Sequence, residues 1–164
     1  MKRALVSPFR TLADPVHFIA FGFGAGLAPR APGTVGSAVG LAIAWALVAL
    51  PFAWRAGIVA AAIALGIWVC GESARRLNRH DDQRIVFDEI AGVLLTALVV
   101  SEGGLLEMAL VFVFFRVFDI VKPWPIREVD HRLGGGLGIM LDDLMAAVAA
   151  AVCVAISEAL LPIS

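Results

Sequence analysis

The sequence predicts an all-α fold: a polytopic membrane helix bundle of about five spans, with a further helix at the N-terminus. Of its 164 residues, 60% are hydrophobic and only 16% are charged, and the mean hydropathy is +0.90. Ordinary globular domains carry about 25% charged residues. The apolar residues also form long runs, and Val35 to Trp54 contains twenty residues without a charge. Such a run is long enough to cross a hydrocarbon core of about 30 Å as a helix. Residues 1–164 are therefore interpreted as one integral membrane domain.

The first apolar segment, Val16 to Leu27, is too short to span. Gly22, Gly24 and Gly26 alternate in it with bulky residues, which favours a re-entrant or interfacial helix that breaks up. Thr34 follows and is predicted to cap the next helix. Backbone N–H groups at that helix N-terminus would form an anion site. A plain loop and cap is the alternative interpretation.

Four further apolar segments follow the first span. They are Ala56 to Gly71, Ile90 to Ser101, Met108 to Phe115, and Leu144 to Ile163. The second and third of these have only twelve and eight uncharged residues. To span a membrane, Ile90 to Ser101 must be extended to include Asp88 and Glu89. Met108 to Phe115 must likewise be extended to include Arg116 and Asp119. This extension places charged side chains at membrane depth on one side of the bundle.

The distribution of basic residues sets the predicted orientation. Most Lys and Arg side chains fall on the side that carries these charges, whereas the opposite loops hold only Arg55. Because cytoplasmic loops are rich in Lys and Arg, the charged side is predicted to face the cytoplasm. The net charge of -1 provides no basic surface for nucleic acid. Cys70 and Cys153 lie in apolar runs, where a small buried hydrophobe is the expected role.

The stretch from Arg116 to Asp143 places an unusual amount of charge between two apolar segments. Arg116, Asp119 and Lys122 are spaced three apart, so on a helix they share one face and can form a ladder of alternating charge. Pro123 then ends the helix close to Lys122. Ionised groups at membrane depth are costly, which makes function the expected reason for keeping them there.

Half of the acidic residues are clustered, and the predicted topology brings these clusters to one face. They are Asp81-Asp82, Asp88-Glu89, Asp119 and Asp142-Asp143, seven of the fourteen acids, and the last pair is expected to open the final helix. Clustered carboxylates repel one another and need protons or a cation. Oxygen ligands without a His or Cys pattern suit Mg²⁺, and nearby Arg and Lys side chains suit a phosphate group. The alternative is a set of helix-end charges that reach water.

Three sequence blocks carry a resemblance. They are GFGAGLAPRAPGTVGS at 22–37, HDDQRIVFDEIAG at 80–92, and FRVFDIVKPWPIREVD with GGLGIMLDD within 115–143. With these blocks the chain resembles the phosphatidylglycerophosphatase A family, bacterial membrane enzymes that convert phosphatidylglycerophosphate to phosphatidylglycerol. The resemblance implies a Mg²⁺-dependent phosphatase of phospholipid biosynthesis, with its active site on the cytoplasmic face of the inner membrane. The family motif positions correspond to Thr34, Asp81, Asp88, Glu89, Asp119, Lys122, Asp142 and Asp143.

The predicted reaction is hydrolysis of a lipid phosphate monoester by Mg²⁺-assisted attack of water. The predicted metal ligands are Asp88, Glu89, Asp119, Asp142 and Asp143. Catalytic roles are assigned to Asp88, Asp119, Lys122 and Asp142, and substrate contacts to Thr34, Arg116, Lys122 and Arg127. The expected partners are the phospholipid substrate and the bilayer, and no nucleic acid.

The alternative function is a small membrane transporter or proton-relay subunit, because intramembrane acids also mark ion pathways. Its weakness is that no chain of ionisable residues crosses to the far side. Glu102, Glu107 and Glu158 are too few and lie near the far end.

Overall fold

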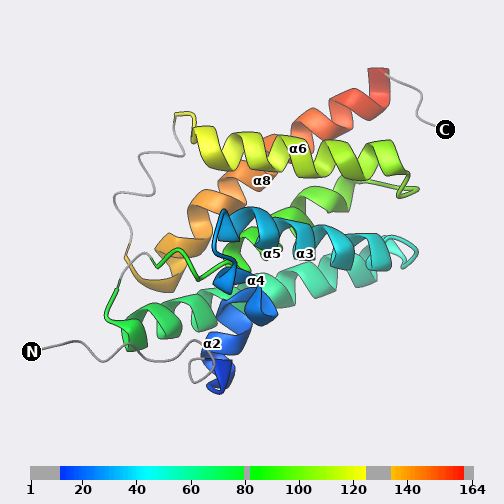
Figure 1. Ribbon diagram of the computed structural model, residues 1–164. Helices are drawn as coiled ribbons and strands as arrows, with labels where there is room; N and C mark the ends of the chain where they lie inside the picture. The colour runs from blue at the N-terminus through cyan, green and yellow to red at the C-terminus, as the bar shows by residue number, and fades with distance from the viewer. Residues whose placement is uncertain (1–11, 80–81, 125–133, 161–164) are drawn as a thin grey trace, which may run out of the picture.

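The computed structural model describes residues 12–79, 82–124 and 134–160, and all regular structure in these ranges is helical (Figure 1). The elements are α2 (Pro15–Ala20), the 3₁₀ helix η1 (Gly22–Leu27), α3 (Pro32–Leu47), α4 (Phe52–Leu77), α5 (Phe87–Thr96), the 3₁₀ helix η2 (Ala97–Val99), α6 (Leu105–Val121) and α8 (Gly135–Leu160). The predicted all-α fold is confirmed.

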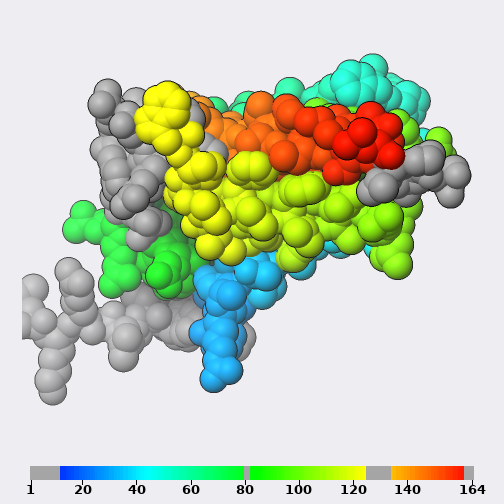
Figure 2. Space-filling model, turned by 90° about the horizontal axis from the view of Figure 1, so that it is seen from above, coloured from blue at the N-terminus to red at the C-terminus, as the bar shows by residue number. Residues whose placement is uncertain are grey.

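The long helices alternate in direction, so that the starts of α3, α5 and α8 and the ends of α4 and α6 meet at one end of the bundle (Figure 1). Helix α5 is central and contacts α3, α4, α6 and α8. Helices α6 and α8 lie side by side along one face (Figure 2). The core around α5 is mostly apolar and includes Ile90, Val93, Phe115 and Met140. The two charged extensions predicted for short segments are confirmed, because α5 includes Asp88 and Glu89 and α6 includes Arg116 and Asp119.

Glycine allows α8 to lie unusually close to α4. A Cβ atom on Gly136 would lie 1.8 Å from the carbonyl oxygen of Ile67, a distance that no side chain permits. Helix α8 begins at Gly135, so the prediction that the last helix opens with Asp142 and Asp143 was wrong. Gly136 and Gly138 lie within α8, and Gly136 lets the backbones of α4 and α8 approach each other, as small residues do between helices.

The first predicted span is divided between two helices. Helix α3 ends at Leu47 and α4 begins after Pro51, so the uncharged run from Val35 to Trp54 is not one helix. Proline favours extended backbone in the residue before it and cannot continue the ladder of helical hydrogen bonds. Helix α3 also begins earlier than predicted, with Pro32 in its first turn, so Thr34 lies inside that turn and is not its cap.

The N-terminal segment breaks as predicted. Phe23 and Gly24 have positive φ angles of 59° and 104°, which interrupt the segment that follows α2. The ring Nδ1 of buried His17 lies 2.8 Å from Ser73 Oγ, and Arg76 Nη1 donates to Asp14 Oδ2 at 2.6 Å. These contacts hold α2 against the C-terminal part of α4.

By length and composition, two of the described helices are apolar and long enough to cross a membrane, namely α4 and α8 with 26 residues each. Core helices of soluble proteins can share these properties, so the five-span topology stays a prediction. The bundle does expose many large apolar side chains, among them Trp54, Trp68 and Ile120, at 69%, 59% and 69% of their surface. Such a surface marks a face that contacts a partner or a lipid.

Candidate active site

A cavity of about 410 Å³ opens at the end of the bundle where the helix starts and ends meet. Seven of the predicted site residues line it: Asp88, Glu89, Arg116, Asp119, Lys122, Asp142 and Asp143. The remaining lining residues come from the first turn of α3, the segment before α5 and the end of α6: Ala31, Pro32, Gly33, Gln83, Ile85 and Ile120. Thr34 is not among the lining residues. Arg127 and Asp81 lie outside the described residues, so their predicted roles stay predictions.

Three carboxylates form the deepest part of the site. Asp88 and Glu89 occupy the first turn of α5, and Asp143 reaches them from α8. One carboxylate oxygen from each lies within 4.8 Å of the other two. Among the described residues, neither Glu89 Oε2 nor Asp143 Oδ2 has a hydrogen-bond partner, although both atoms are buried. Buried oxygens of this kind need compensation, and this donor set fits Mg²⁺.

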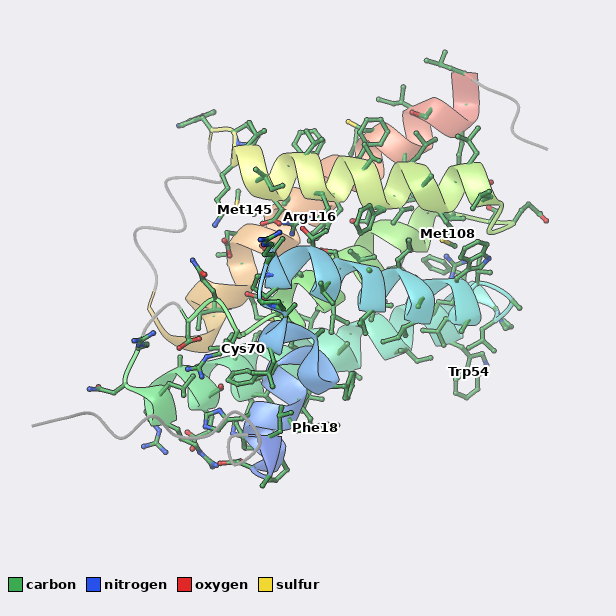
Figure 3. The ribbon with its side chains drawn as sticks, in the orientation of Figure 1. Phe18, Trp54, Cys70, Met108, Arg116 and Met145 are labelled. Carbon is green, nitrogen blue, oxygen red and sulfur yellow. The ribbon has the colours of Figure 1, made fainter. Side chains whose placement is uncertain are left out.

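Arg116 brings positive charge beside the carboxylates. Its Nη1 donates to Asp119 one turn later in α6, which confirms this part of the predicted ladder. The same atom donates to Ser37 Oγ at 3.3 Å, and Figure 3 shows Arg116 reaching toward the start of α3. The guanidinium therefore joins α6 to α3 at the cavity wall.

Lys122 brings the second positive charge from the end of α6, which confirms the prediction that the helix ends close to this residue. It is the C-cap of α6 and has a left-handed conformation, with φ 43° and ψ 63°. Its backbone N–H still donates to the Phe118 carbonyl oxygen at 2.9 Å, and its side chain lines the same cavity as Arg116 and Asp119. Its Nζ donates to Asp142 Oδ2 on α8. The Pro123 that follows explains why the chain must leave the helix here.

An ion pair between Arg84 and Asp82 stabilises the segment before α5. The sequence analysis placed Asp82 only among the acidic clusters. Arg84 donates to both carboxylate oxygens of Asp82, Nε to Oδ1 at 2.7 Å and Nη2 to Oδ2 at 2.8 Å. The guanidinium of Arg84 also lies 5.3 Å from the ring centroid of Phe21. The hydrogen bonds from Arg84 hold the pKa of the Asp82 carboxyl below its ordinary value. Asp82 thus positions the segment that leads to Asp88 and does not line the cavity.

Sequence reasoning missed two polar residues at the site, Ser37 and Gln83. Both lie inside the sequence blocks quoted above, but neither carries a charge, and charge was the signal used to select candidates. Ser37 is fully buried and Gln83 is exposed at the cavity edge. The i→i−4 spacing from Ser37 to Gly33 was the available local signal, since serine often bonds to the carbonyl one turn earlier.

The fold and the site together define a class of protein: an apolar helical bundle that gathers carboxylates and cations in one cavity at the end of its helices. The family model for phosphatidylglycerophosphatase A matches residues 18–158. The chain belongs to the phosphatidylglycerophosphatase A family.

The relatives agree with this assignment. The chain is 37% identical to the phosphatidylglycerophosphatase A of Escherichia coli, over 85% of this chain and 81% of that protein. It is 36% identical to the phosphatidylglycerophosphatase A of Haemophilus influenzae, over 88% and 89% of the two chains. It is also 36% identical to a putative phosphatidylinositol-3-phosphatase of Bacteroides thetaiotaomicron, over 85% and 91%. No solved structure matches the chain significantly.

Proposed function

We propose that this protein hydrolyses the terminal phosphate of phosphatidylglycerophosphate to give phosphatidylglycerol in phospholipid biosynthesis, with Mg²⁺ bound at the acidic cluster. The observation that carries this proposal is the meeting of three carboxylates from α5 and α8 in one cavity with Arg116 and Lys122. Two of the relatives are named for this reaction. The third is named for another lipid phosphate monoester, which supports the same substrate chemistry.

The acidic cluster is suited to hold the metal. Asp88, Glu89 and Asp143 would provide the ligands, since their oxygens converge and two of these residues have buried oxygens without a partner among the described residues. Asp119 and Asp142 line the same cavity but already accept hydrogen bonds from Arg116 and Lys122. When bound, Mg²⁺ polarises the phosphoryl oxygens and lowers the pKa of a coordinated water.

The residues around the cluster would share the work of the reaction. The oxygen of a water attacks phosphorus, the bond from phosphorus to the glycerol oxygen breaks, and the leaving oxygen takes up a proton. A carboxylate of the cluster would accept the proton of the attacking water. Arg116 and Lys122 would neutralise the charge on the phosphoryl oxygens, and Asp119 and Asp142 would hold these two cations in place.

We further propose that α3, α4, α5 with η2, α6 and α8 form a five-helix membrane bundle whose acidic end faces the cytoplasm. The exposed apolar side chains and the alternating helix directions support this arrangement. Helix α5 has ten residues, about 15 Å of helix, so it cannot reach across the hydrocarbon core alone. Its carboxylates would then lie near headgroup depth, where a lipid phosphate can reach them without leaving the membrane.

The alternative of a transporter or proton relay has less support. Glu107, the acid expected near the far end, is 4% exposed and accepts a hydrogen bond from the Gly104 N–H at 2.8 Å. This bond stabilises the start of α6, which is a structural role. Among the described residues, the group of three converging carboxylates lies at the opposite end of the bundle.

The direct test is phosphate release by the purified protein from phosphatidylglycerophosphate in mixed micelles. We expect release with Mg²⁺, none with EDTA, and recovery when Mg²⁺ is restored. Phosphatidylinositol 3-phosphate serves as the competing substrate, because one relative is named for it. Turnover that survives complete removal of metal would reject the role of Mg²⁺. Hydrolysis of the inositol lipid alone would reject phosphatidylglycerophosphate as the substrate.

A further inference from the structure

Ser37 lies behind the cavity wall and connects two parts of the site. It is fully buried in α3. Its hydroxyl donates to the carbonyl oxygen of Gly33 at 2.9 Å and accepts from Nη1 of Arg116 at 3.3 Å. A hydroxyl can do both at once, since it has one donor and two acceptor lone pairs.

The guanidinium of Arg116 is held through one atom. Among the described residues, all its hydrogen bonds are made by Nη1, to Ser37 Oγ and to Asp119 Oδ2. Its Nη2 has no partner among these residues, and Arg116 lines the cavity. A long side chain loses conformational entropy when it is held in one geometry, so two fixed acceptors on the same nitrogen restrict where the other nitrogens point.

We infer that Ser37 is a positioning residue for the phosphatase reaction: it fixes Nη1 of Arg116 so that Nη2 is directed to the phosphoryl oxygens of the substrate. This inference rests on the proposed function. Asp119 alone would leave the guanidinium free to rotate about a single contact within α6. Ser37 adds a contact from α3, the helix whose first turn also lines the cavity.

The test is a double-mutant cycle on the purified protein with phosphatidylglycerophosphate as substrate. Ser37→Ala should lower kcat/KM about tenfold, as expected when a hydrogen bond to a charged group is lost. Arg116→Lys keeps a positive charge but has no Nη1 for Ser37 to hold. In that background Ser37→Ala should change kcat/KM less than about twofold.

Ser157→Ala is the matched control. Ser157 makes the same i→i−4 bond, to the carbonyl oxygen of Cys153 at 2.8 Å, but it lies at the other end of α8. It should retain wild-type kcat/KM. Ser37→Cys is the second variant: it fills the space of the hydroxyl with a weakly bonding sulfur and should lose activity as Ser37→Ala does.

The outcomes separate the two proposals. If the wild-type protein hydrolyses the lipid and Ser37→Ala has the same kcat/KM, the role of Ser37 is overturned. It is also overturned if Ser37→Ala lowers kcat/KM equally with Arg116 and with Lys at position 116. Full activity in Ser37→Cys would show that volume matters and hydrogen bonding does not, which also overturns it. A wild-type protein and a Ser157→Ala variant that both fail to hydrolyse the lipid would overturn the proposed function itself.

Discussion

Gly33 lies directly against the carboxylate of Glu89: a Cβ atom on Gly33 would be 2.3 Å from Oε1 of Glu89. The start of α3 and the start of α5 therefore approach each other through a residue without a side chain. We predict that Gly33→Ala displaces the Glu89 carboxylate and lowers kcat by at least about tenfold, since small misplacements at a reacting centre are costly. Phosphate release and Mg²⁺ affinity would be measured together.

Gly57→Ala provides the control for this substitution. Gly57 lies in α4, and a Cβ there would meet no atom within 4 Å. This variant should keep wild-type turnover and should not lose stability, because alanine is the better helix former. Wild-type activity in Gly33→Ala would mean that Glu89 does not need its present position.

The two neighbouring aspartates of α8 should differ in their effect on metal binding. Asp143 belongs to the group of converging oxygens, whereas Asp142 accepts a hydrogen bond from Lys122. Asp142→Asn should weaken the binding of Mg²⁺ about tenfold, as changes around a metal site do. Asp143→Asn should weaken it more than about a hundredfold, because a ligand is lost. Manganese binding followed by electron paramagnetic resonance measures this without turnover. Equal losses in the two variants would contradict the assignment of ligands.

The ion pair between Asp82 and Arg84 should make stability depend on pH in the acidic range. The folded-state pKa of Asp82 lies below its ordinary value of 3.8, chiefly because Arg84 donates hydrogen bonds to the carboxylate. The carboxylate therefore stabilises the fold fully above the unfolded-state pKa, and this stabilisation is lost as the pH falls through the folded-state pKa. The difference in unfolding free energy between wild type and Asp82→Asn should be constant from about pH 7 to about pH 5 and shrink below about pH 4.

Thermal or denaturant unfolding in detergent measures this difference, and Glu102→Gln is the control. Glu102 is an exposed carboxylate in the turn before α6, and its substitution removes the same charge. Its effect should be small at every pH, as expected for a surface charge. A difference for Asp82→Asn that stays constant down to about pH 2 would show that the carboxylate charge does not stabilise the segment.

Cys70 should have no part in the reaction. It is fully buried in α4 and does not line the cavity. Cys70→Ala should keep near wild-type kcat and lose about 1 kcal/mol of stability, since it removes one buried atom from a packed core. Turnover and thermal unfolding of the variant would be measured side by side. Loss of activity in a well-folded Cys70→Ala variant would place the chemistry elsewhere.

The sequence by itself determined seven of the charged side chains that gather at the site. Apolar segments that are short and bounded by charge imply helices with charged ends, and alternating helix directions bring those ends together. The pair between Arg116 and Asp119 was predictable for the same reason, because three-residue spacing on a helix is a local property.

The tertiary structure alone decided how these side chains are held. Ser37 and Arg116 are far apart in the chain, and their hydrogen bond exists only because α3 and α6 pack together. The close approach of Gly136 in α8 to the Ile67 carbonyl likewise depends on a second helix, α4. A glycine that allows a turn and a glycine that allows two backbones to touch have the same local preference, so only the neighbouring helix distinguishes them.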